Sequence, residues 1–124
     1  MGIISKFFAV AMLAGLPLLA GAHGNMQPQH GGIVQMSGET VFELVVNASS
    51  VELYVSEDDE PVSNTSATAK LTVTASGKKT ETALAPAADG GFAAAVKIPK
   101  GASVGVTVVD KTSGAKTFTV YTLK

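Results

Sequence analysis

Short runs of alternating residues fill the chain beyond residue 30 and restrict its fold more than any other feature. In these runs β-branched or apolar residues alternate with polar ones, the period of a half-buried strand, and turn-forming residues separate the runs. The expected strands cover residues 40–47, 51–57, 69–75, 79–84, 92–98, 103–109 and 116–123. About seven short strands with turns every 8–12 residues or so are typical of two packed antiparallel sheets. We therefore expect an all-β fold, a single antiparallel β-sandwich of immunoglobulin-like or cupredoxin-like type, over residues 33–124.

The expected strand 40–47 illustrates how alternation assigns residues to the two faces of a sheet. Phe42, Leu44 and Val46 fall on one face, which is the more apolar and the better candidate for the core. Glu43 falls on the opposite face. Its carboxylate is therefore expected to point outward or toward the amino-terminal segment.

Residues 1–22 are organised like a cleavable secretory signal helix. Lys6 supplies one positive charge ahead of an apolar run over residues 7–19. Residues 20–22 read Ala-Gly-Ala, which places small residues where signal peptidase requires them. This pattern predicts export, and the short positive region favours a bacterial periplasm as the destination.

A transmembrane anchor is the alternative interpretation of the amino-terminal segment. A spanning helix needs about 20 apolar residues, and Pro17 and Gly21 interrupt this run. A lipid anchor would need a cysteine, which the chain lacks. We expect cleavage after Ala22, no membrane attachment afterwards, and a mature chain that begins at His23.

Composition excludes several classes of partner and site. Without Lys6, eight lysines face ten acidic residues, and the chain contains no arginine, which argues against a nucleic-acid partner. The absence of cysteine excludes disulfides, thiolate zinc sites and blue-copper sites. The absence of tryptophan makes a large aromatic ligand platform a poor expectation.

Histidine and methionine are concentrated in one short stretch. Both histidines, and the two methionines that remain after cleavage, lie within residues 23–36. These side chains bind copper and neighbouring metals when cysteine is absent. Residues 23–32 are rich in Gly, Gln, Asn and Pro, so we expect a flexible segment that can bring His23 and His30 together. The pattern predicts a metal site for a copper ion, with zinc or another divalent transition metal as the alternative.

An amino-terminal histidine would strengthen such a site. The α-amine and Nδ1 of His23 can chelate one ion in a six-membered ring, and His30 can add a second imidazole, a set of nitrogens suited to Cu(II). Met26 could add a thioether that favours Cu(I), and Glu43 could add a carboxylate. The expected metal-ligating residues are therefore His23, Met26, His30 and Glu43.

Each of these residues also has an ordinary structural interpretation. His23 could simply be a frayed terminus. His30 could cap the turn made by residues 31–32 and donate a hydrogen bond into the sheet. Met26 and Met36 could fill space in the core.

Several short motifs carry a resemblance to a known family. The stretches 30–34 (HGGIV), 42–45 (FELV), 53–55 (LYV) and 61–62 (PV) resemble small exported proteins of heavy-metal-tolerant proteobacteria. A similar HGG…E-L pattern occurs in an amino-terminal domain of some periplasmic adaptor subunits of heavy-metal efflux pumps. The resemblance implies a β-sandwich that handles copper, zinc, cobalt, nickel or silver, with a periplasmic efflux or metal-delivery protein as partner. The matching positions are His30, Gly31, Gly32 and Glu43.

Three functions from different classes follow, in this order. The first is a periplasmic metal-binding protein for metal buffering, delivery or resistance. The second is a metal-free immunoglobulin-like module that binds a partner protein. The third is a histidine-brace copper oxidase, which the small size of the domain and the lack of tryptophan disfavour. No serine elbow, cysteine nucleophile or phosphate-binding loop is present, so we predict no catalytic residues and no enzyme.

Overall fold

The computed structural model describes residues 27–123, and this part of the chain is all-β. Its elements are β1 (Ile33–Ser37), β2 (Thr40–Val46), β3 (Val51–Glu57), β4 (Glu60–Pro61), β5 (Ala67–Ala75), β6 (Lys78–Pro86), β7 (Phe92–Ala94), β8 (Ser103–Asp110) and β9 (Lys116–Thr122). Among these residues no helix is long and apolar enough to cross a membrane. The expected signal helix, His23 and Met26 lie outside the described residues.

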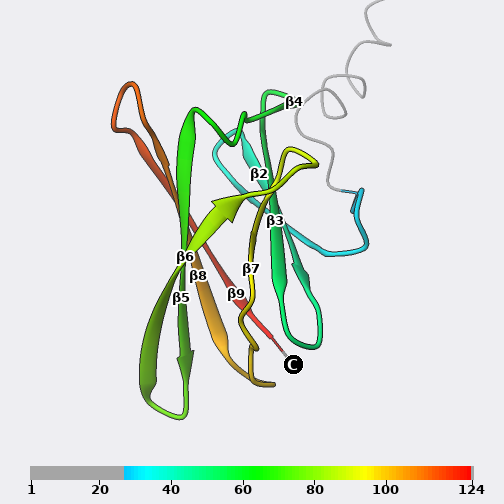
Figure 1. Ribbon diagram of the computed structural model, residues 1–124, viewed down its shortest axis with the longest axis vertical. Helices are drawn as coiled ribbons and strands as arrows, with labels where there is room; N and C mark the ends of the chain where they lie inside the picture. The colour runs from blue at the N-terminus through cyan, green and yellow to red at the C-terminus, as the bar shows by residue number, and fades with distance from the viewer. Residues whose placement is uncertain (1–26, 124) are drawn as a thin grey trace, which may run out of the picture.

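Every strand pairing is antiparallel, and the strands form one continuous path. The order is β1-β2-β3-β7-β6-β5-β8-β9, with the two-residue β4 attached to β3. Figure 1 shows this path folded into two layers, one around β2 and β3 and the other around β5, β8 and β9. The end of β6 joins the layers through a short pairing with β7. The predicted all-β antiparallel fold is confirmed.

The hydrophobic core lies between the two layers. The largest fully buried side chains are Tyr121, Phe42, Phe92, Leu44, Leu53, Leu71, Val51, Val104 and Val106. They come from alternate positions of their strands, because successive side chains of a strand point to opposite faces. Phe42 and Leu44 are buried as predicted, whereas Val46, at the end of β2, is 36% exposed. The predicted core face is therefore buried at Phe42 and Leu44 but not at the last residue of the strand.

Most strand boundaries lie within two residues of the prediction, and the larger differences are at β1, β4 and β7. β1 was not among the predicted strands; a two-residue connection, in which Gly38 has a φ of +62°, joins it to β2. β4 contains only two residues, too few for any periodicity. β7 ends at Ala94 rather than at Ile98, although Val96 and Ile98 still pack against the core. Alternating burial therefore continues beyond the last hydrogen bond of β7. The sequence pattern cannot distinguish the hydrogen-bonded strand from the extended segment that follows it.

Candidate functional site

The carboxylate of Glu43 is the centre of the candidate site. Its Oε1 accepts a hydrogen bond from the backbone N–H of Gln29 at 2.9 Å. Its Oε2 accepts hydrogen bonds from the backbone N–H groups of His30 and Gly32, each at 2.8 Å. Successive N–H groups that converge on one anion form a nest, and here the anion belongs to the chain itself. Glu43 therefore points toward the amino-terminal segment, as expected, and is only 5% exposed.

The two glycines of the HGG motif have different roles. Gly31 has a φ of +77°, in the left-handed region that favours glycine. Gly32 lies against β2, and a Cβ at this position would be 2.5 Å from the carbonyl oxygen of Leu44. The first glycine turns the chain, and the second lets the backbone approach the strand. Together they allow residues 29–32 to wrap around the carboxylate.

The environment of Glu43 keeps it ionised. Burial raises the pKa of its carboxyl. Hydrogen bonds from Gly32, Gln29 and His30 together lower the pKa by more, so it lies below its ordinary value of 4.5. An ionised carboxylate can only accept hydrogen bonds. The His30 Nδ1 atom, 3.1 Å from Oε1, must therefore be the donor in that contact.

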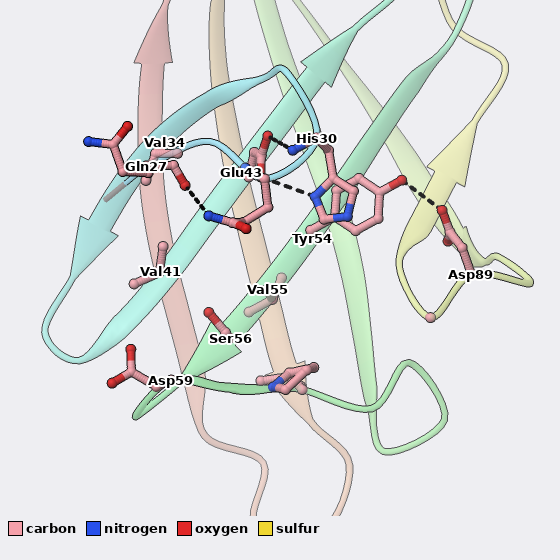
Figure 2. Close-up of a pocket in the computed structure, with 14 residues that line it drawn as sticks. Gln27, His30, Val34, Val41, Glu43, Tyr54, Val55, Ser56, Asp59 and Asp89 are labelled. Atoms are coloured by element: carbon pink, nitrogen blue, oxygen red, sulfur yellow. Dashed lines mark hydrogen bonds and ion pairs between the residues drawn. The ribbon is translucent and has the colours of Figure 1, made fainter. Parts of the chain in front are cut away.

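The His30 ring is held on two sides. Its Nδ1 contacts Glu43, and its face stacks on the ring of Tyr54 with centroids 3.5 Å apart and planes 3° apart. Figure 2 shows the two rings overlapping beside the Glu43 carboxylate. The His30 side chain is 42% exposed, and its Nε2 makes no hydrogen bond to residues 27–123. The ring is thus oriented, with one nitrogen engaged and the other available.

Tyr54 is fixed in turn by acidic residues. Its hydroxyl lies 2.7 Å from Asp89 Oδ2 and 3.0 Å from Glu52 Oε1, and its single proton serves one carboxylate at a time. The hydrogen bond to Asp89, with burial second, raises the pKa of Tyr54, and the same hydrogen bond lowers the pKa of Asp89. A Cβ at Gly91 would be 2.7 Å from the Tyr54 ring. The loop between β6 and β7 is therefore shaped to receive this tyrosine.

A cavity of about 320 Å³ opens beside this group of residues. Its lining residues are Gln27, Gln29, His30, Val34, Val41, Glu43, Tyr54, Val55, Ser56, Asp59, Pro61, Val62, Asp89 and Gly90. They come from the amino-terminal segment, from β1, β2 and β3, from the β3–β4 turn with β4 and the residue after it, and from the loop before β7 (Figure 2). Carboxylates and aliphatic side chains line it together, and no lysine is among them.

The structure brings together two of the four predicted metal ligands, His30 and Glu43. The other two, His23 and Met26, lie outside the described residues. Within residues 27–123 no group of three or more His, Asp or Glu side chains could hold a metal ion. Each oxygen of Glu43 already accepts two hydrogen bonds, so in this arrangement Glu43 orients His30. The interpretation in which His30 donates into the sheet also agrees with this geometry.

Sequence reasoning did not select Tyr54 and Asp89 as site residues. The signal for Tyr54 was present, because residues 40–47 and 51–57 were expected to be consecutive strands of an antiparallel fold. In the observed register Tyr54 is the direct partner of Glu43, on the same face. Asp89 carried no such signal, since its position depends on how the loop after β6 returns to β3.

Comparisons with known proteins give one match. No family model and no curated protein matches this chain. Among solved structures, the chain is similar to the crystal structure of the Br derivative of BhCBM56, with a TM-score of 0.45 and 11% sequence identity. The match covers 74% of this chain and 99% of that one. A similarity of this size carries no argument about function.

Proposed function

We propose that this protein is an exported metal-binding protein that takes part in copper buffering, delivery or resistance in the periplasm, with His30 as a ligand. The observation that supports this most directly is the hydrogen bond between His30 Nδ1 and Glu43 Oε1. Histidines that bind metals commonly donate their other ring N–H to a carboxylate, which fixes the tautomer and makes the ligating nitrogen more basic. In His30 the hydrogen bond from Nδ1 to Glu43 leaves Nε2 for the metal. Zinc, cobalt, nickel and silver are the alternative ions.

In this proposal Glu43 has a different role from the one expected from sequence. It acts as a positioning residue, since four hydrogen-bond donors occupy its oxygens. A metal bound directly to this carboxylate would have to displace backbone N–H groups of the amino-terminal segment. A metal bound at His30 Nε2 leaves those hydrogen bonds intact.

The remaining ligands of the proposed site come from the sequence just before the described residues. His23 and Met26 precede Gln27, and Gln27 lines the cavity beside His30. After cleavage at Ala22, His23 would offer its α-amine as well as its ring. A set of two imidazoles, an amine and a thioether suits copper in either oxidation state.

Native mass spectrometry of the protein purified from the periplasm tests this proposal. The intact mass reports whether the chain begins at His23, and the mass after adding one equivalent of Cu(II) reports whether an ion is retained. We expect one copper per chain, and loss of retention in His23→Ala and His30→Ala. Glu43→Gln should weaken copper binding by about 10–100-fold, the usual effect of removing a carboxylate behind a ligand.

Met26 and Met36 provide a matched control for the proposed ligand set. Met26→Leu should weaken the binding of Cu(I). Met36→Leu should leave it unchanged, because Met36 lies in β1 and is not among the proposed ligands. A correctly processed chain that retains neither Cu(II), Cu(I) nor zinc would overturn the proposal.

The metal-free partner-binding module remains the second candidate. The aliphatic part of the cavity favours it, because a metal site alone does not need such a wall. It predicts an unchanged mass in the presence of metal and a complex whose formation is insensitive to chelators.

A further inference from the structure

The cavity beside His30 has a feature that the proposed metal site does not use. Asp59, Asp89 and Glu43 all line it, and none of the lysines of residues 27–123 is in its lining. The carboxyl groups of Asp and Glu are ordinarily ionised at neutral pH. The cavity therefore favours a ligand that carries positive charge.

The part of the cavity between the His30–Tyr54 pair and Asp59 is apolar (Figure 2). Val34, Val41, Val55, Pro61 and Val62 line it, from strands β1 to β4 and the residue that follows. Figure 2 shows Val41 and Val55 on adjacent strands, between the His30–Tyr54 pair and Asp59. A hydrated inorganic cation gains nothing from such a wall, whereas an organic ligand buries its carbon atoms against it. The combination points to an organic cation.

The volume restricts the size of that ligand. Small-molecule pockets span roughly 300–1,000 Å³, and this cavity, at about 320 Å³, lies at the lower end. Fixed walls favour binding, because little order has to be created when the ligand enters. Here His30 is stacked on Tyr54, Tyr54 is bonded to Asp89, and Glu43 holds the loop.

We propose that this cavity binds a small organic amine, with the ammonium group beside the carboxylate of Asp59 and the carbon skeleton against the valines. This goes beyond the proposed metal site and does not depend on it. The two sites share His30, so the amine is tested on protein freed of metal by a chelator.

Benzylammonium chloride and benzyl alcohol provide a matched pair of probes, since they have similar shapes and differ in charge. Calorimetric titration of the metal-free mature chain at low salt should show saturable binding of benzylammonium. The alcohol should bind about tenfold more weakly or not at all, and added salt should weaken the binding of the ammonium. Equal binding of both probes, or no saturable binding of either, would overturn the proposal.

Two neighbouring aspartates of one turn supply the matched variants. Asp59 lines the cavity and Asp58 does not. Their φ values are similar, 66° and 53°, and asparagine tolerates this region well, so both variants should fold like the native chain. Asp59→Asn should weaken benzylammonium binding about two- to fivefold, as expected for one partly exposed ion pair. Asp58→Asn should leave it unchanged, and an equal loss in both variants would contradict a local contact.

These outcomes are separate from those of the metal experiment. Copper retention reports on His23 and His30, whereas discrimination between the two probes reports on Asp59 and the aliphatic wall. Failure of copper retention would leave the amine site standing. Failure of probe discrimination would leave the metal site standing.

Discussion

Glu43 is a buried carboxylate whose cost of burial is offset locally. Removing a charged group from water is expensive unless it is hydrogen-bonded, and hydrogen bonds to an ionised acceptor are stronger than neutral ones. Three backbone N–H groups and the ring of His30 supply those bonds within residues 29–32. One side chain of β2 thus organises a loop that has no regular secondary structure of its own.

The acid dependence of stability should report on this residue. The pKa of Glu43 in the folded protein lies below 4.5, so the folded state binds fewer protons than the unfolded state in the acid range. The stabilisation that ionised Glu43 provides is therefore complete at a pH above its pKa in the unfolded state. It is lost as the pH falls through its pKa in the folded state. Glu43→Gln should cost about 1–3 kcal/mol at pH 7, because an amide cannot accept all of these hydrogen bonds. Urea unfolding at pH 7 and pH 3 should show the variant to be less sensitive to acid than the native protein.

Glu81 offers the control for that measurement. It lies on the surface of β6, 3.6 Å from Lys70, in an exposed pair that contributes little. Glu81→Gln should change stability by no more than about 0.5 kcal/mol. Similar losses in Glu43→Gln and Glu81→Gln would contradict the role assigned to the buried carboxylate.

At the scale of elements, the loop of residues 29–32, which contains the HGG motif, contacts β2 through its backbone. Gly32→Ala should destabilise the protein by about 1–3 kcal/mol, because the added Cβ would overlap the Leu44 carbonyl and push the loop from the strand. Gly31→Asn should cost only a few tenths of a kcal/mol, since asparagine tolerates positive φ and no atom lies within 4 Å of the added Cβ. Thermal and urea unfolding of both variants would measure the difference. Equal effects would show that close approach is not what selects glycine at position 32.

The elements also show what sequence patterns can predict. Six of the seven expected strands overlap closely with β2, β3, β5, β6, β8 and β9, because alternation over a half-buried strand is a strong signal. β4 was missed because a two-residue pairing has no period. The contact between Glu43 and the amino-terminal segment was one of the two orientations expected from the face on which Glu43 falls. The position of Asp89 did not, because a loop that crosses between layers leaves no periodic trace.

At the scale of the whole molecule, Tyr121 connects the two layers. It lies in β9, and its hydroxyl donates a buried hydrogen bond of 3.0 Å to the backbone carbonyl of Phe42 in β2. Burial, with the negative charge of Glu43 second, raises the pKa of this tyrosine. The hydroxyl therefore remains a donor throughout the ordinary pH range.

Removing that hydroxyl should lower the stability of the entire domain. Tyr121→Phe keeps the buried ring but leaves the Phe42 carbonyl without this donor, at a cost of about 1–2 kcal/mol. For a domain of this size each kcal/mol lowers the melting temperature by about 4–8 °C. Tyr54→Phe, which loses a hydrogen bond nearer the surface, should have a smaller effect. Differential scanning calorimetry of both variants gives the comparison, and an equal shift would contradict a special role for the link between layers.

The carboxylate that fills the nest formed by Gln29, His30 and Gly32 is covalently part of the receptor that binds it. A tethered partner acts at an effective concentration of the order of millimolar or higher, without the entropy lost when a free ion is captured. Phosphate, chloride or organic acids in the surroundings must compete with an occupant that cannot diffuse away. The shape of the loop that presents His30 is therefore insulated from the ionic composition of its medium.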